Sequence, residues 1–153
     1  APKFDKNIGI YIIGGEPTEE YIKLKKECLA ENVHFEGFKS KYELLNYYKA
    51  ADLFVLPTRE DTWGLVINEA MACGLPIITT NRCIAGLELV DSENGCIIPT
   101  DSSQDLTDAI KKIIADKQKI DYMGRKSLER IKWYTFQNMA QIHLKYFRNF
   151  LEN

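Results

Sequence analysis

Residues 51–80 read ADLFVLPTREDTWGLVINEAMACGLPIITT, and this stretch decides most of the fold. Two short apolar runs, Asp52–Pro57 and Pro76–Thr80, have the composition of strands buried on both faces. Between them lies a helical pattern near Leu65–Cys73. A strand, a helix and a second strand in this order predict a unit with parallel strands, and therefore an α/β protein.

The same alternation continues in both directions from this stretch. Ser40 and Glu43 form a capping box, which predicts the start of a helix over Lys41–Ala50. Other strands are expected at Ile8–Ile13, Val33–Phe38 and Gly95–Pro99, and other helices after Pro17 and Thr18 and near Leu87. The helix after Thr18 is expected to present an apolar stripe of Tyr21, Ile22, Leu24, Cys28 and Leu29. The fold class predicted is a doubly wound, mostly parallel sheet of Rossmann-like type.

The sequence pattern of the last third of the chain predicts additional helices and no further strands. One is expected around Leu106–Ile114, a second over Ile120–Ile131, and a third that carries Met139, Ile142, Tyr146, Phe147 and Phe150. We interpret the aromatic stripe of the third helix as core. Its length suggests that it also packs against something beyond this domain.

Size and composition favour a single domain over residues 1–153. The chain is 45% apolar, enough for a sizeable core. Its 20 basic and 22 acidic residues are mixed along the sequence, which argues against nucleic acid as a partner. The 4 cysteines are far apart and predict a reducing, cytoplasmic compartment. No run approaches the roughly 20 apolar residues of a membrane span.

The loop Pro57–Gly64 is the strongest candidate site. Ligands of open α/β sheets bind beyond the carboxyl ends of the strands, and this polar loop ends at a glycine that begins a helix. The first amides of a helix lack partners within it, and the helix dipole favours an anion there. The amides of Gly64, Leu65 and Val66 are therefore candidates for an anion site, although many helix starts bind only water or a capping side chain.

Two acidic residues flank this helix start. Helical spacing places Glu69 on a face with apolar side chains such as Cys73, where a charge needs a partner. That partner could be Arg59 or Arg82 in a salt bridge, or the hydroxyls of a ligand, and the sequence leaves both interpretations open. Asp61 could cap the helix or contact the same ligand.

Other polar residues carry weaker signals. Gly14 and Gly15 allow a tight turn after the first strand, for geometry alone or for close approach to a ligand. His34 and His143 are isolated, which indicates packing or surface roles. The sequence contains no metal-ligand constellation and no nucleophile elbow or triad pattern.

Residues 51–57 (ADLFVLP) and 59–76 (REDTWGLVINEAMACGLP) together resemble the signature region of the family 4 glycosyltransferases. These are retaining enzymes with two facing Rossmann-like domains, the GT-B architecture. The resemblance extends to GGEP at 14–17, ENVHFEGF at 31–38, ENG at 93–95 and WYTFQNMA at 133–140. It implies that the chain is the C-terminal, donor-binding half. The acceptor domain and the first strand of this half are expected upstream of Ala1.

The resemblance implies roles for the residues of the candidate loop. Asp61 would contact the hydroxyls of the donor sugar, and Glu69 would contact the ribose. The amides of Gly64, Leu65 and Val66 would hold the diphosphate. Neither acid is expected to act as a nucleophile.

The resemblance also implies roles for two earlier loops. Backbone at Gly37, Phe38 and Lys39 would face the nucleobase, and the loop at Gly14 and Gly15 would border the diphosphate.

The chain departs from the family pattern at several positions. Asp61 stands where a longer Glu is commoner, Glu16 replaces a glycine, and Cys83 with Ile84 replaces a glycine pair. Sugar identity and the shape of the cleft are expected to differ accordingly. The Arg and Lys that clamp the diphosphate in the family would precede this chain.

The function implied is transfer of a sugar, with retention, from a nucleoside diphosphate sugar to an acceptor hydroxyl, in envelope polysaccharide or glycolipid synthesis. No cofactor and no metal are expected. The acceptor would bind mainly to the missing domain, so the isolated chain should be inactive. The longer protein could act at the inner face of a membrane. Two alternatives remain: a sugar-nucleotide epimerase of the same architecture, and a non-catalytic module that binds a nucleotide sugar.

Overall fold

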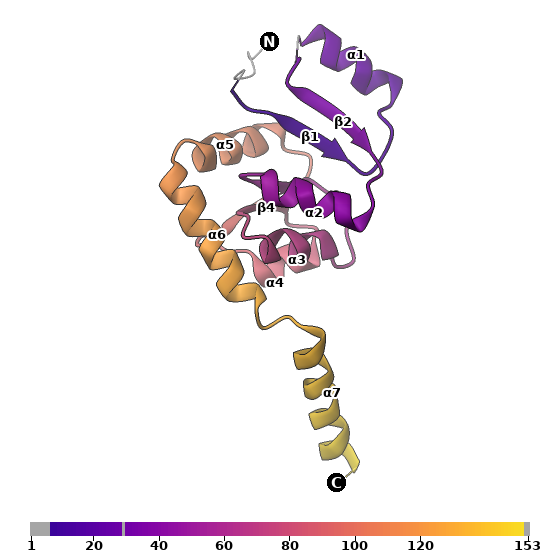
Figure 1. Ribbon diagram of the computed structural model, residues 1–153, viewed down its shortest axis with the longest axis vertical. Coiled ribbons are helices and arrows are strands. Elements are labelled where there is room, and N and C mark those ends of the chain that lie inside the picture. The colour runs from indigo at the N-terminus through magenta and orange to yellow at the C-terminus, as the bar shows by residue number, and fades with distance from the viewer. Residues whose placement is uncertain (1–6, 29, 152–153) are drawn as a thin grey trace. The chain divides into compact units, whose positions relative to one another are not determined.

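The computed structural model describes residues 7–28 and 30–151 (Figure 1). Strands and helices alternate along the chain until β5, and three helices follow it. The contacts fall into two compact units, Ala1–Tyr47 and Tyr48–Asn153. Each unit is described below by itself.

The first unit contains a pair of parallel strands, the helix that connects them and the first part of the helix that follows. Strands β1 (Ile10–Ile13) and β2 (Val33–Gly37) pair from Ile10 opposite Val33 onward, with an irregularity near Ile13. Helix α1 (Glu19–Glu27) connects them, and the Thr18 hydroxyl caps its start by accepting from the amide of Tyr21 at 3.4 Å. The predicted order of elements is confirmed.

The apolar stripe expected on α1 stays largely exposed. Tyr21, Ile22 and Leu24 are 57%, 40% and 53% exposed, and none of the described residues of α1 is buried. Leu29, the last member of the stripe, lies outside the described residues. A sheet of two strands offers little surface to cover such a stripe. The apolar periodicity therefore predicted the position of the helix, but its apolar side chains are not buried.

Helix α2 (Lys41–Ala50) begins at the capping box that the sequence predicts. The amide and the hydroxyl of Ser40 donate to Glu43 Oε2 at 2.8 and 2.5 Å, and the amide of Glu43 donates to the Ser40 hydroxyl at 3.4 Å. These bonds provide partners for amides that the first helical turn leaves without them. The bounds of α2 agree with the prediction.

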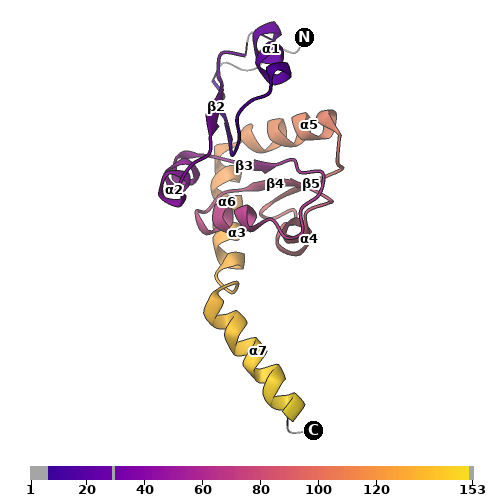
Figure 2. The same cartoon turned by 90° about the vertical axis from the view of Figure 1, so that its right-hand side faces the viewer.

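The second unit is built on a parallel sheet of three strands. The strand order is β3 (Phe54–Leu56), β4 (Ile77–Thr80) and β5 (Gly95–Ile98). Helix α3 (Leu65–Ala72) connects β3 to β4, and helix α4 (Ile84–Leu89) connects β4 to β5. Figure 2 shows α3 and α4 on one side of this sheet and α5 (Ser103–Ile114) on the other. The second unit therefore has two layers of helices around a central sheet.

The central strand β4 is buried on both faces, as its uninterrupted apolar composition predicts. Ile78 packs into a cluster with Ile113 of α5 and Met123 of α6 (Lys117–Ile131). Thr79 points to the opposite face, where a Cβ at Gly86 of α4 would lie 2.4 Å from its methyl group. Successive residues of β4 thus point to opposite faces of the sheet and pack against different layers of helices.

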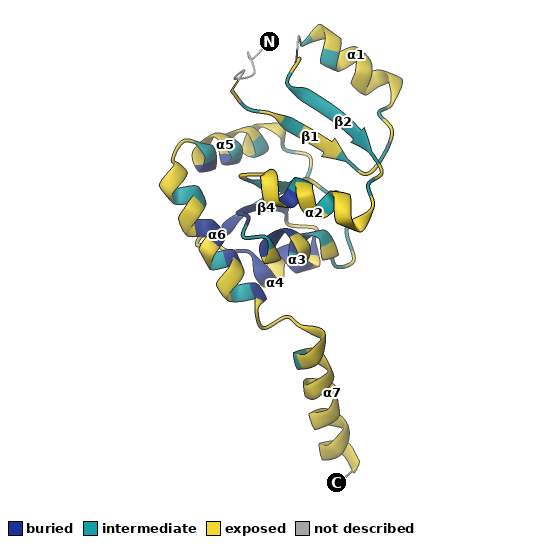
Figure 3. Ribbon diagram, in the orientation of Figure 1, coloured by how far each residue is buried: buried dark blue, intermediate teal, exposed yellow. Residues whose placement is uncertain are grey.

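The final helix, α7 (Phe136–Leu151), carries the predicted stripe, but the interpretation of that stripe as core is wrong for the described chain. Phe136, Tyr146 and Phe150 are 84%, 72% and 82% exposed, and no described residue of α7 is buried (Figure 3). The amphipathic pattern specified a helix with one apolar face. It did not supply a surface within this chain to cover that face.

The predicted α/β fold with parallel strands is confirmed. The strands divide between a pair and a sheet of three. Each strand is shorter than its predicted apolar run at one end or at both. Pro57, Pro76 and Pro99 lie just outside β3, β4 and β5, because proline has no amide hydrogen to donate to a ladder. Among the described residues, every helix is too short or too polar to span a bilayer.

Candidate functional site

The loop between β3 and α3 is held by hydrogen bonds with the last residue of β4 and with the segment after it. The Thr80 hydroxyl donates to the carbonyl oxygen of Thr58 at 2.7 Å. The amide of Asp61 donates to the carbonyl oxygen of Arg82 at 3.1 Å, and Asp61 forms a parallel bridge with Cys83. Both segments follow the carboxyl ends of their strands, where α/β sheets bind ligands. The loop is therefore a fixed part of the sheet edge.

Gly64 makes the tight connection from this loop into α3. Its φ of +92° lies in the left-handed region, and a Cβ here would sit 2.5 Å from Cys83 Sγ. The Cys83 thiol in turn donates to the carbonyl oxygen of Trp63 at 3.2 Å. Only glycine fits this position without strain.

The start of α3 has no side-chain cap and no acidic residue in its first turn. Leu65 and Val66 are the first residues of the helix, where amides have no partner in the preceding turn. The positive end of the helix dipole lies at the same place. This helix start can accept an anion, as the sequence predicted for Gly64, Leu65 and Val66.

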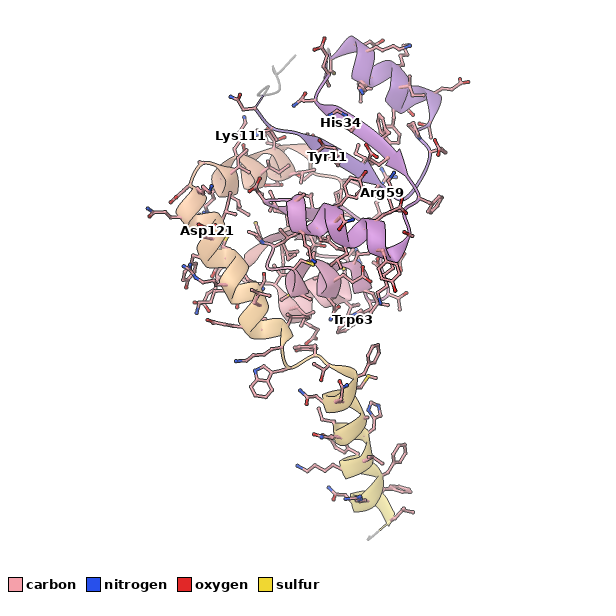
Figure 4. All side chains as sticks on the ribbon, viewed as in Figure 1. Tyr11, His34, Arg59, Trp63, Lys111 and Asp121 are labelled. Atoms are coloured by element: carbon pink, nitrogen blue, oxygen red, sulfur yellow. The ribbon has the colours of Figure 1, made fainter. Side chains whose placement is uncertain are left out.

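Asp61 is half-buried on the entry to this helix start. One of its carboxylate oxygens accepts from the amide of Trp63 at 3.1 Å. The Trp63 indole, labelled in Figure 4, donates to the side-chain oxygen of Asn68 at 2.9 Å and so ties the loop to α3. The carboxylate of Asp61 is therefore fixed within the loop instead of capping α3 directly.

Glu69 is exposed, so the face on which spacing places it, with Cys73, is not the buried face of α3. The buried face of α3 carries Ile67, Ala70 and Met71, and Glu69 falls on the neighbouring arc of this short helix. Its partner is also different from the arginines considered above. The Tyr48 hydroxyl donates to Glu69 Oε2 at 3.1 Å.

Arg59 forms its ion pair elsewhere. Its Nε lies 2.7 Å from Asp101 Oδ1, in an exposed pair between the loops that follow β3 and β5. Asp101 has a φ of +58°, an unusual backbone conformation for a residue other than glycine. The acid that pairs with Arg59 is therefore Asp101, and not Glu69 as one of the two interpretations had it.

Tyr48 is the residue of this site that sequence reasoning missed. It is 6% exposed, lies on α2, and packs edge-on against Phe54 with ring centroids 5.7 Å apart. Burial first, and then the negative charge of Glu69, raise the pKa of Tyr48 well above its usual value. A tyrosine in an apolar helical pattern carries no local signal of a carboxylate partner 21 positions later.

The first unit holds the other predicted site residues. Gly14 has a φ of +118°, and its amide donates to the carbonyl oxygen of Gly37 at 2.9 Å; Gly37 itself has a φ of +60°. A Cβ at Gly15 would meet nothing within 4 Å, so the turn there is open. Phe38 is 83% exposed. The roles implied for these residues with a nucleobase or diphosphate stay predictions.

Lys39 belongs to a small charged network in the first unit. Its ammonium group lies 3.2 Å from Glu36 Oε2, which also accepts from the Tyr47 hydroxyl at 2.6 Å. The bond from Tyr47, followed by that from Lys39, holds the pKa of Glu36 below its usual value. The bond to Glu36 likewise raises the pKa of Lys39. The side chain of Lys39 is therefore engaged within its own unit.

The two histidines have the packing and surface roles that were expected. His34 stacks on Tyr11 of the paired strand, with ring centroids 4.8 Å apart. Both residues are labelled in Figure 4. His143 Nδ1 lies 2.8 Å from the carbonyl oxygen of Met139 on α7. Within the described residues, no three His, Cys, Asp or Glu side chains gather as they would around a metal ion.

A parallel α/β sheet with an uncapped helix start between two carboxylates can hold an anionic ligand that carries hydroxyl groups. The chain belongs to the family of group 1 glycosyl transferases, whose model matches residues 2–130.

Two curated relatives show the range of the family. A D-inositol 3-phosphate glycosyltransferase of Paenarthrobacter aurescens (strain TC1) is 32% identical over 108 residues, which are 69% of this chain and 26% of that protein. CapM, a capsular polysaccharide biosynthesis glycosyltransferase of Staphylococcus aureus, is 29% identical over 148 residues, 91% of this chain and 39% of that protein. The chain thus spans well under half the length of either relative.

A solved structure has the same fold as this chain. HepE of Anabaena, crystallised in complex with UDP, matches with a TM-score of 0.76 and 23% identity over 97% of this chain and 42% of that one. The predicted GT-B relationship of the fold is confirmed.

Proposed function

We propose that this chain is the donor-binding half of a retaining glycosyltransferase and that it binds a nucleoside diphosphate sugar at the start of α3. The observation that carries the proposal is the uncapped start of α3 at Gly64, with Asp61 on its entry loop and Glu69 within the helix. The family membership of the chain and the UDP bound to HepE support the same ligand class.

The amides of Leu65 and Val66 bind the diphosphate in this proposal. When the bond between the anomeric carbon and the diphosphate oxygen breaks, its electron pair remains on the diphosphate. The negative charge that develops there is stabilised by fixed amide dipoles that need no reorganisation. The acceptor oxygen then bonds to the anomeric carbon on the face that the leaving group occupied, which retains the configuration. The proton of the acceptor hydroxyl passes to an oxygen of the leaving diphosphate.

The two carboxylates bind hydroxyl groups on either side of the diphosphate. Glu69 accepts from the ribose hydroxyls and Asp61 from the sugar, so both acids orient the donor and neither attacks it. Since α3 supplies the counter-dipole, we propose that no metal ion is needed. Chelation with EDTA should then leave nucleotide affinity unchanged.

Activity belongs to the longer protein in this proposal. The upstream part is expected to bind the acceptor, and the relationship to CapM favours an envelope polysaccharide or glycolipid. We propose a cytoplasmic location from the dispersed cysteines, at the inner face of the membrane for the longer protein.

Calorimetric titration of this chain with UDP, GDP and ADP tests the proposal. One nucleotide should bind, and Glu69→Ala should weaken its binding about 10- to 100-fold, the range expected for lost hydrogen bonds to a charged group. Glu88→Ala is the matched control, because Glu88 is an exposed glutamate on α4 of the same unit. Binding that Glu69→Ala leaves unchanged would place the nucleotide elsewhere and refute the site.

A further inference from the structure

The hydroxyl of Tyr48 and the carboxylate of Glu69 form a pair within the second unit. Tyr48 is held by burial, at 6% exposure, and by its edge-on contact with Phe54. Its ring therefore has one position, and its hydroxyl presents a fixed donor 3.1 Å from Glu69 Oε2. Glu69 itself lies at the surface of α3 and has three side-chain torsions that would otherwise be free.

The donor in this pair is neutral. An arginine or lysine would orient the carboxylate but would also neutralise its charge, whereas a phenol orients it and leaves the charge in place. In the described part of the chain, no other side chain donates to this carboxylate. Oε1 thus keeps its full capacity to accept hydrogen bonds from a ligand.

We propose that Tyr48 is a positioning residue, which fixes one oxygen of the Glu69 carboxylate so that the other binds the ribose hydroxyls of the donor nucleotide. This inference rests on the proposed function, since it assumes that ribose binds at Glu69. It adds a residue from α2 to a site otherwise built from α3 and its entry loop. Removing the hydroxyl should release Glu69 into several rotamers and weaken every bond that depends on its orientation.

A core role of Tyr48 would also make its substitution harmful, so the test must report on ribose alone. We would titrate wild type and Tyr48→Phe with UDP and with its 2′,3′-dideoxy analogue. The ratio of these two affinities measures what the ribose hydroxyls contribute. A lower folded fraction weakens both ligands by the same factor and leaves the ratio unchanged, because both bind the folded state.

The expected result is a fall of about fivefold in the preference of Tyr48→Phe for UDP over the dideoxy analogue, the size of one oriented hydrogen bond. The affinity for the analogue should stay as in wild type after correction for folding. In Glu69→Gln the preference should be lost, and adding Tyr48→Phe to that variant should change nothing more. Tyr47→Phe is the matched control, because its hydroxyl bonds to Glu36 and not to Glu69.

Two different results would overturn the inference. If Glu69→Gln abolishes the preference while Tyr48→Phe keeps it in full, Tyr48 has only a packing role and the proposed function stands. If wild type binds UDP, but no better than the dideoxy analogue, ribose does not bind at Glu69, and the proposed function and the role of Tyr48 fail together. If GDP or ADP is the nucleotide that binds, the same comparison is made with that nucleotide and its dideoxy analogue.

Discussion

Gly64→Ala should destabilise the second unit through two separable effects at the start of α3. The first is backbone strain, because the φ of +92° is unfavourable for alanine by about 1–2 kcal/mol. The second is steric: the new Cβ would lie 2.5 Å from Cys83 Sγ, and overpacking of this kind costs about 1–3 kcal/mol. Cys83 is fully buried and bonded to Trp63, so its thiol has no free space to enter.

The sum of about 2–5 kcal/mol is a large part of the about 5–15 kcal/mol that stabilises a typical domain. Urea unfolding followed by tryptophan fluorescence would measure it, because both tryptophans, Trp63 and Trp133, lie in the second unit. The Cys83→Ala background separates the two effects. There the steric part should vanish, and Gly64→Ala should retain only the backbone cost of about 1–2 kcal/mol.

Gly14→Ala is the control for the backbone effect. Gly14 also has a positive φ, of +118°, but a Cβ there would meet nothing within 4 Å. Its unfolding, followed by the circular dichroism of the whole chain, should show the strain without a clash. The reasoning is refuted if Gly64→Ala costs under about 1 kcal/mol, or if its cost is the same with and without the Cys83 thiol.

Three further substitutions test the framework of the second unit. Burial raises the pKa of Asp91, but the bond and the charge of Arg130, together with the amides of Glu93 and Asn94, outweigh burial and hold the folded-state pKa low. Arg130→Gln should therefore destabilise the protein at pH 7 by under about 1 kcal/mol. Urea titrations should show this loss shrinking as the pH falls below about 4, where folding no longer favours the carboxylate. Asp116→Ala removes the side chain that accepts from two amides at the start of α6, and thermal unfolding should show a loss of about 1 kcal/mol. Gly124→Ala would place a Cβ 2.2 Å from the carbonyl oxygen of Gly74, and a loss below about 1 kcal/mol in urea unfolding would contradict this close approach of α6 to the turn after α3.

The candidate site was located from sequence because its signals are local. A polar loop that follows an apolar strand and ends at glycine before a helical pattern specifies the start of α3, and the structure places that start at Leu65 as predicted. The capping box at Ser40 worked in the same way, since its partners are three residues apart. Helix and strand propensities, and hydrogen bonds between residues close along the chain, can be predicted from a single sequence.

The environment of Glu69 could not be read in this way. Spacing placed its carboxylate on a face with apolar neighbours, but that face is not the buried one, because α3 buries Ile67 and Met71 instead. Its partner Tyr48 lies on a different helix, and a tyrosine with apolar neighbours is usually core. Which helix face meets the sheet depends on the packing of several elements at once.

The sequence by itself determined the order of strands and helices, the parallel α/β class, the capping of α2 and the glycine-led start of α3, because each depends on residues that are close along the chain. Only the tertiary structure decided that Cys83 meets Gly64, that Tyr48 holds Glu69, and that the apolar face of α7 is uncovered within the described chain. Those outcomes join segments about 20 residues or more apart, or depend on which surface is available to cover an apolar face. The hydrophobic effect is non-directional, so a local pattern marks the apolar residues but does not specify what covers them.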